Sequence, residues 1–310
     1  MDRFHLEFEH AEGPPGVVVL WLEQPGKPVV VLDEDLIRRL DATLDAVPSE
    51  SAGLVVASRA PRSFVAGADL KAIMALGDNQ LHRYLEFGAR VFGRLAAFPF
   101  PTAAAIGAAA LGGGLELAMH CDGLITCKPE PKDDGSPGKP FPIGLPEAGL
   151  EICPGWGGTN LLPARMDPRS AIRHTAVGSP MKSDEAEDMG LFDAVAESPD
   201  VLVEAARGWV RSQRDPLSRD GSPSRWIGRK SVAAGVMSAV DTLRDDLSGE
   251  PAEAVLAAVN KGLSDGWQAA LAEERDRLVR LRSRPAGREA IEAFFARSAG
   301  SSGTKPAAKA

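Results

Sequence analysis

IGAAALGGGLELAMHCD, residues 106–122, is the stretch around which the rest of the chain is organised. It is typical of a short apolar strand, three glycines and an apolar helix that begins on the glycines. Glycine at a helix start forfeits side-chain packing, so we expect another group to approach the backbone closely there. Since a helix N-terminus presents unpaired N–H groups and a positive dipole end, this group is an anion, or an oxygen that becomes one during a reaction. Glu116 follows in the first turn, inside an otherwise apolar run.

The residues alone leave a structural interpretation of this motif open. Three glycines before a helix also occur where elements pack tightly, and a first-turn glutamate is favourable at a surface because it faces the helix dipole. The spacing lacks the G-x-G-x-x-G pattern of a dinucleotide site, and no Gly-Lys-Ser/Thr follows as in a P-loop. Nucleotide binding is therefore not predicted from this stretch.

The segments before this stretch predict a parallel α/β sheet. A charged, alternating N-terminus and the apolar run 17–22 indicate a hairpin, residues 33–47 have the spacing of an amphipathic helix, and GLVVAS at 53–58 indicates another buried strand. Strand, helix and strand with short links imply a right-handed crossover. Ligands of such sheets bind beyond the carboxyl ends of strands, which places a site at the loop 59–69 and at the glycines.

Composition narrows the class of protein. The chain has 310 residues, 44% of them hydrophobic and 25% charged, which is typical of a soluble globular protein with a substantial core. A net charge of −8 disfavours nucleic acid or an anionic membrane as the main partner. Three cysteines without a CxxC pair, no secretory segment and no apolar run of about 18 residues favour a cytoplasmic protein with reduced thiols.

Four blocks, in order, resemble the crotonase, or enoyl-CoA hydratase/isomerase, superfamily. They are FVAGADLKAI at 64–73, PTAAAIGAAALGGGLELAMHCD at 101–122, LPEAGLEICPGWGGTNLLPA at 145–164 and MKSDEAEDMGLFDAV at 181–195. The segment 269–297 further resembles the end of the hydratase portion of multifunctional fatty-acid oxidation enzymes. The resemblance implies an α/β fold, a spiral of ββα units, followed by a C-terminal helical region.

The resemblance also implies the residues that perform the chemistry. In the family, two backbone amides hold the thioester oxygen of an acyl-CoA, and the matching residues are Ala68 and Gly113. Losing one donor of this kind costs about 3 kcal/mol of barrier. The two glutamates of the hydratases match Glu116 and Glu147, whose apolar neighbours are expected to raise their pKa values toward useful acid/base strength. Gly155 matches a residue whose backbone helps to hold the water.

Further positions are assigned to substrate and CoA by the same resemblance. Lys71 matches a residue that reaches the CoA phosphates, although a solvated helix charge is an equal alternative. The other expected substrate-binding residues are Ala66, Leu115, Trp156, Phe294 and Arg297. Trp156 is bulkier than the usual residue and is expected either to reshape the acyl pocket or to belong to the core.

Several positions depart from the family pattern. Glu151 stands where a glycine is usual, and a third carboxyl so close to Glu147 could shift the pKa values of the others. Gln24 replaces a basic residue, which weakens the expected phosphate binding. His120 could bond to Glu116 but is better interpreted as a core histidine, because no ligand at metal spacing joins it, so no metal is predicted. The long loop 128–142 is expected to be exposed near the pocket, as a possible lid.

Four segments are predicted. Residues 1–214 form the catalytic core, 215–229 a polar connector, 230–297 a helical region and 298–310 a mobile tail. The family commonly forms trimers or hexamers, so a homo-oligomer is expected.

The expected activity is enoyl-CoA hydration, with coenzyme A as part of the substrate and no other cofactor. The alternatives are a Δ3-Δ2-enoyl-CoA isomerase, which generally needs only the acid at Glu147, and a non-catalytic acyl-CoA-binding scaffold.

Overall fold

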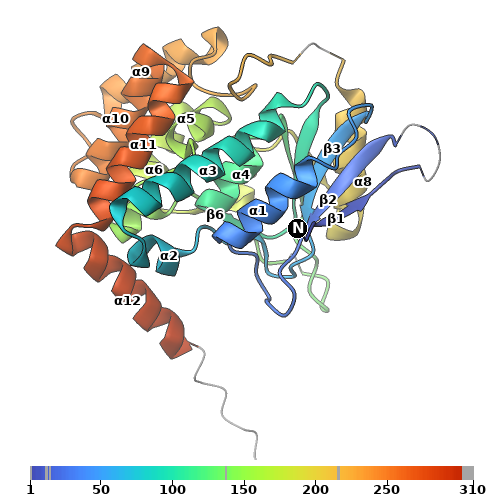
Figure 1. Ribbon diagram of the computed structural model, residues 1–310, viewed down its shortest axis with the longest axis horizontal. Coiled ribbons are helices and arrows are strands. Elements are labelled where there is room, and N and C mark those ends of the chain that lie inside the picture. Colours follow the sequence, from blue (N-terminus) through green and yellow to red (C-terminus); the bar gives the residue numbers. More distant parts are fainter. Residues whose placement is uncertain (1, 11–12, 14, 137, 215–216, 302–310) are drawn as a thin grey trace, which may run out of the picture.

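Two sheets carry the fold (Figure 1). The computed structural model describes residues 2–10, 13, 15–136, 138–214 and 217–301. The larger sheet has the strand order β1 (His5–Glu7), β2 (Val17–Leu22), β3 (Gly53–Ser58), β5 (Thr102–Ile106), β7 (Gly123–Cys127) and β10 (Ala194–Ala196). All of its neighbouring strands are parallel except the β1–β2 pair. The smaller sheet has the order β4 (Ser63–Val65), β6 (Ala109–Leu111), β8 (Pro142–Gly144) and β9 (Met181–Lys182).

The chain passes between the two sheets in repeated steps. β3 continues into β4 and α2 (Leu70–Ala75), β5 into β6 and α4 (Gly113–Met119), and β7 into β8 and the 3-10 helix η1 (Glu147–Leu150). Each step adds one parallel strand to the larger sheet and one strand to the smaller sheet. This arrangement is a spiral of ββα units, and it brings the starts of α2, α4 and η1 to one region.

Both faces of the larger sheet are covered, which explains why its strands are nearly continuous apolar runs. Val17, Val19 and Val55 pack against α8 (Leu202–Ser212) on one face. Val18 and Leu20 point to the other face, into the main core beneath α1 (Glu34–Leu44) and α3 (Asp78–Ala97). The predicted helix 33–47 and the predicted strands 17–22 and 53–58 are thereby confirmed.

Helices form the C-terminal part of the chain. α9 (Lys230–Leu243) and α10 (Glu250–Asp265) pack on α6 (Pro168–Val177), while α11 (Trp267–Arg282) lies between α10 and α3. α12 (Pro285–Ser301) runs past η1 and α2 (Figure 1). The remaining short elements are α5 (Gly158–Leu161), η2 (Leu162–Ala164), α7 (Ser183–Asp188) and η3 (Pro199–Val201). No helix among the described residues is both long and apolar enough to cross a bilayer.

Most of the predicted segment boundaries stay predictions. Residues 217–229 pack back onto the core, where Arg219 bonds to Asp122. The expected mobile tail, 298–310, begins inside α12, whose backbone is helical to Ser301. Its last residues, 302–310, lie outside the described part of the chain.

Candidate active site

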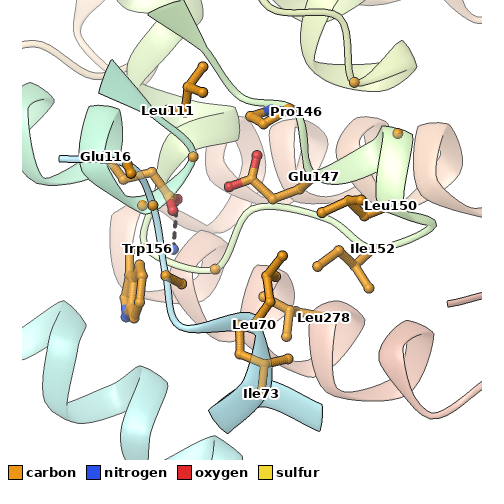
Figure 2. Close-up of a pocket in the computed structure, with 18 of the residues that line it drawn as sticks. Leu70, Ile73, Leu111, Glu116, Pro146, Glu147, Leu150, Ile152, Trp156 and Leu278 are labelled. Carbon is orange, nitrogen blue, oxygen red and sulfur yellow. Dashed lines mark hydrogen bonds between the residues drawn. The ribbon is translucent and has the colours of Figure 1, made fainter. Parts of the chain in front are cut away.

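A cavity of about 270 Å³ opens where the starts of α2, α4 and η1 meet (Figure 2). α11 and α12 close it by contributing Leu278 and Phe294. Its walls are mainly apolar side chains and glycine backbone, including Leu70, Ile73, Leu111, Pro146, Leu150, Ile152 and Trp156. Such a lining with few polar groups suits an acyl chain and its thioester.

Two backbone amides border this cavity and have no acceptor among the described residues. The backbone hydrogen bonds around Ala68 are made by its neighbours: Leu32 donates to the Gly67 carbonyl (2.9 Å) and Asp69 donates to the Leu32 carbonyl (3.1 Å). The Ala68 amide takes no part in these bonds. Gly113 is the first residue of α4, where an N–H has no intrahelical acceptor. Both residues were predicted from the sequence as an oxyanion hole, and the fold brings them to one cavity.

Each of the three glycines at the start of α4 is required by a close neighbour. Gly112 has φ of 52°, and a Cβ there would lie 2.5 Å from Glu147 Oε1. A Cβ on Gly113 would lie 2.4 Å from Cζ3 of Trp156, and one on Gly114 would lie 2.2 Å from the Val65 carbonyl oxygen. Tight packing and close approach of an acid therefore both contribute to this motif.

Glu116 is buried in the first turns of α4 and is held by a loop on the opposite side. Its Oε1 accepts hydrogen bonds from the amides of Trp156 (2.7 Å) and Gly158 (2.8 Å). Burial raises the pKa of Glu116 well above its ordinary value, and the Glu274 and Glu147 carboxyls raise it further, while the two amides oppose the shift. Glu116 therefore retains a proton far more readily than a glutamate in water.

Glu147 starts η1 and points into the cavity toward Glu116 (Figure 2). Its Oε2 is buried without a hydrogen-bond partner among the described residues. Burial raises the pKa of Glu147 to about 8, and Glu274 adds to the increase. A buried carboxyl oxygen with no protein partner is suited to bind a water molecule or a reacting group.

A third buried acid, Glu274 of α11, was missed in the sequence. It accepts hydrogen bonds from the amides of Gly157 and Thr159 and from the Thr159 hydroxyl. Burial raises its pKa to about 7, against the effect of these donors. The signal was present, because Glu274 occupies the apolar face of a helix whose other buried residues include Trp267, Leu271 and Leu278.

Some of the other predicted site residues line the cavity and others do not. Ala66, Gly155, Trp156 and Phe294 line the cavity. Leu115 does not line it, because its side chain is fully buried in the core. Lys71 and Arg297 are exposed on α2 and α12, outside the cavity wall, and Lys71 Nζ lies 5.6 Å from the centre of the Phe295 ring.

Trp156 belongs both to the core and to the cavity wall. Only 2% of the residue is exposed, and its Nε1 donates to the Leu85 carbonyl (2.9 Å). The indole makes edge-to-face contacts with Tyr84 and Phe92, and Gly88 leaves room for it on α3. Trp156 is thus a core residue, as one interpretation of the sequence had it, and the effect of its bulk on an acyl pocket stays a prediction.

Glu151 does not place its carboxyl beside Glu147 in the cavity. Its side chain is exposed and does not line the cavity, because the residue ends η1 in the left-handed conformation with φ of 58°. The usual glycine of the family suits this backbone. The third carboxyl near the pair is Glu274 instead.

Two further expectations are corrected or refined. The loop 128–142 is exposed, but none of its described residues lines the cavity, so the position near the pocket was wrong. It packs instead beside Ser183 and Glu187. His120 is a core histidine, as preferred from the sequence: its Nδ1 lies 2.8 Å from the Glu116 carbonyl oxygen, and burial lowers its pKa to about 4.

Replacing Glu151 by glycine is expected to stabilise the protein. Glycine adopts the left-handed conformation without the steric cost of a Cβ, which is about 1 kcal/mol per residue. The free energy of unfolding, measured by urea denaturation, should rise by about that amount while any activity stays unchanged. A destabilised variant would show that the Glu151 side chain makes a favourable contact.

Glu147→Gln is expected to be more stable than the wild type at alkaline pH. The pKa of Glu147 is about 8 in the folded chain and about 4.3 when unfolded. Its raised pKa favours folding fully below pH 4 or so, and this contribution is lost as pH rises through 8. Urea denaturation at pH 5 and pH 9 should therefore show that the variant gains about 4 kcal/mol over the wild type between the two conditions, because these two pKa values correspond to about three pKa units over that range. Parallel curves for both proteins would contradict a buried, proton-binding Glu147.

Comparison with known proteins identifies the family. Residues 12–216 match the enoyl-CoA hydratase/isomerase family, and the chain belongs to this family within the crotonase superfamily. Over 293 residues it is 28% identical to the fatty acid oxidation complex subunit alpha of Vibrio cholerae serotype O1. That alignment covers 90% of this chain but 39% of the relative, so the chain spans well under half of that subunit.

Solved structures show the same fold. The enoyl-CoA hydratase of Bacillus halodurans is 19% identical with a TM-score of 0.64, covering 94% of this chain and 100% of that one. The human mitochondrial delta3-delta2-enoyl-CoA isomerase is also 19% identical, with a TM-score of 0.65, covering 93% of this chain and 96% of that one. The crotonase-like spiral predicted from the sequence is thereby confirmed.

Proposed function

We propose that this protein is an enoyl-CoA hydratase that adds water syn to a trans-2-enoyl-CoA and forms a 3-hydroxyacyl-CoA. The observation that carries the proposal is a single cavity with two acceptor-free amides on one side and two buried carboxyls, Glu116 and Glu147, on another. Hydration requires both a group that takes a proton from water and a group that gives one to the α-carbon.

The reaction follows from this arrangement. The Ala68 and Gly113 amides donate to the thioester oxygen, and the Gly155 backbone helps to hold the water. One carboxylate of the pair takes a proton from the water while the water oxygen bonds to the β-carbon. The electron pair of the C=C bond moves toward the thioester oxygen, where the two amides stabilise the enolate. The other acid protonates the α-carbon, and the two acids have then exchanged their protonation states.

The raised pKa values of the two acids suit this exchange. Two carboxyls in one apolar cavity do not both ionise readily, so the pair holds a proton near neutral pH. One member then serves as base and the other as acid. Addition of water leaves the substrate with no net oxidation or reduction, so the proposed reaction needs no redox cofactor, and CoA enters as part of the substrate.

The CoA portion is proposed to lie along α2 and α12. Lys71 and Arg297 are exposed cations on these helices. Phe294 lines the cavity and is partly exposed, and the centre of the Phe295 ring lies 5.6 Å from Lys71 Nζ. The CoA phosphates would bind these cations through charge-assisted hydrogen bonds, which are stronger than bonds between neutral groups. A homo-oligomeric trimer or hexamer is likewise proposed, and light scattering of the purified chain tests it.

The decisive test follows the absorbance of the enoyl thioester. Purified protein should consume crotonyl-CoA and release 3-hydroxybutyryl-CoA, identified by mass spectrometry. Turnover of a 3-enoyl-CoA without hydration would establish the isomerase alternative. Binding of CoA by calorimetry without turnover of either substrate would establish the non-catalytic scaffold.

A further inference from the structure

Two buried acids hold residues 156–159, the loop that leads into α5 and the start of that helix, from two sides. The four consecutive amides of this segment alternate between them: Trp156 and Gly158 donate to Glu116 of α4, while Gly157 and Thr159 donate to Glu274 of α11. Gly157 makes the alternation possible because its φ of 99° suits glycine, and a Cβ there would lie 2.3 Å from the Trp267 ring. Neither set of bonds can change without moving the loop that the other acid holds.

We propose that Glu274 is a positioning residue for Glu116. Glu274 fixes the loop so that Glu116 presents its Oε2 to the cavity, and the negative charge of the ionised Glu274 keeps Glu116 protonated. The proposal rests on the proposed hydration, in which Glu116 and Glu147 act as the acid and base. Glu274 itself does not line the cavity, so it acts through Glu116.

The hydrogen bonds distinguish the protonation states of the two acids. Both oxygens of Glu274 accept bonds, Oε1 from the Thr159 amide (2.8 Å) and hydroxyl and Oε2 from the Gly157 amide. A carboxylate that accepts several donors is favoured over the neutral acid. Among the described residues, the donors to the Glu116 carboxyl all reach Oε1, which leaves its Oε2 able to carry the proton. The negative charge of Glu274 further disfavours ionisation of Glu116.

Few other charges face this pair. Glu147 of η1 and the Cys153 thiol lie close enough to interact with Glu274, and Cys153 Sγ donates to the Glu274 backbone carbonyl (3.6 Å). The neutral imidazole of His120 makes an edge-to-face contact with Trp267 of α11. Several charged residues of α11 are engaged in ion pairs with other residues, namely Arg277–Glu273 within the helix and His82–Asp276 and Arg282–Asp78 at its contact with α3. The negative charge of Glu274 therefore acts mainly on the two catalytic acids.

Glu274→Gln tests this role against a purely structural one. The variant removes the charge and one acceptor oxygen, so kcat should fall roughly 100-fold through misplacement of Glu116, with KM little changed. Loss of the negative charge lowers the pKa of Glu116, so the alkaline limb of the pH–rate profile should move to lower pH by about one unit. Glu273→Gln, at the neighbouring position on α11, is the matched control and should leave kcat and the profile unchanged.

A measurement that needs no turnover separates this proposal from the proposed function. The infrared band of protonated carboxyl groups, assigned to Glu116 by its loss in Glu116→Gln, should titrate with a lower midpoint in Glu274→Gln than in the wild type. Thr159→Val, which removes the hydroxyl that donates to Glu274 and accepts from the Asn160 side-chain amide, should shift the midpoint in the same direction by less, and Thr159→Ser should restore it. An unchanged midpoint in both Glu274→Gln and Thr159→Val would overturn the role of Glu274, whereas absence of turnover in the wild type would overturn only the hydratase.

Discussion

Glu116→Gln is expected to lower kcat for hydration of crotonyl-CoA about 1,000-fold, the usual contribution of a positioned acid or base. Glutamine can still accept the Trp156 and Gly158 amides through its Oε1, so the loop stays in place. What is lost is the second oxygen, which is the one that exchanges a proton. The variant should therefore retain the fold, and its KM should change far less than its kcat.

Glu147→Gln should be impaired to a similar degree, and the double variant should lose little more than either single one, because the two acids act as a unit. Glu151→Gln is the matched control: it removes an exposed carboxyl at the end of the same 3-10 helix and should keep full activity. Wild-type turnover of crotonyl-CoA by Glu116→Gln would remove Glu116 from the mechanism.

The same two variants separate hydration from isomerisation. Moving a double bond needs a single acid that takes a proton from one carbon and returns it to another, a role that fits Glu147. If 3-enoyl-CoA turnover survives in Glu116→Gln but not in Glu147→Gln, the isomerase is the correct assignment. Loss of activity on both substrates in both variants would favour the hydratase with a shared site.

Local signals in the sequence predict the parallel α/β sheet, and the resemblance to the crotonase superfamily adds the spiral of ββα units. The apolar runs at 17–22 and 53–58 are strands buried on both faces, and the amphipathic spacing of 33–47 corresponds to α1. The smaller sheet is less visible, since its strands have only two or three residues and the loop predicted at 59–69 contains one of them, β4. Strands so short carry almost no alternation.

The site divides in the same way. Ala68, Gly113, Glu116 and Glu147 lie in motif blocks, and the fold brings all four to one cavity. Glu274 lies on a helix far along the chain, and only the tertiary contact of α11 with the 156–159 loop shows that it faces the same acids. Glu151 is close to Glu147 in sequence, but this closeness does not determine where its side chain points. Its left-handed backbone turns the side chain toward solvent.

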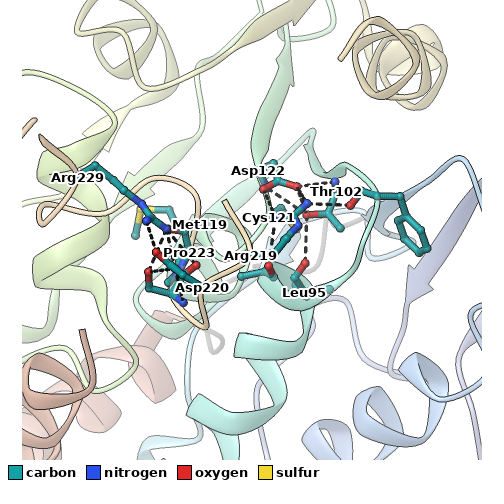
Figure 3. Close-up of polar contacts among 12 residues, drawn as sticks. Leu95, Thr102, Met119, Cys121, Asp122, Arg219, Asp220, Pro223 and Arg229 are labelled. Atoms are coloured by element: carbon teal, nitrogen blue, oxygen red, sulfur yellow. Dashed lines mark hydrogen bonds and ion pairs between the residues drawn. The ribbon is translucent and has the colours of Figure 1, made fainter. Parts of the chain in front are cut away.

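The connector predicted at 215–229 shows a further limit of composition. Its polar, glycine- and proline-rich sequence indicates a loop, but does not show what it contacts. Arg219 donates to both oxygens of the buried Asp122 (2.8 and 2.9 Å) and to the carbonyls of Ala96 and Phe100 (Figure 3). Asp122 is the last residue of the stretch 106–122 and also accepts hydrogen bonds from the Thr102 amide and hydroxyl, so the connector is bonded to the start of β5.

Arg219→Met is therefore expected to destabilise the protein by about 3–5 kcal/mol, the usual cost of removing one partner from a buried ion pair. Methionine keeps the length of the side chain but leaves the Asp122 carboxylate, 2% exposed, with only its Thr102 donors. Urea denaturation measures the loss. Arg173→Gln, which breaks an exposed pair with Asp246, is the control and should cost no more than about 1 kcal/mol.

The partner variant makes the argument specific to the pair. Asp122→Asn in the Arg219→Met background removes the charge that the first substitution leaves unpaired, so the double variant should be more stable than the sum of the two single effects predicts. Additive losses would mean that Arg219 contributes mainly through the Ala96 and Phe100 carbonyls. Because Asp122 lies just beyond α4, whose first turn carries Glu116, a real coupling would also show that the connector supports the helix on which the proposed chemistry depends.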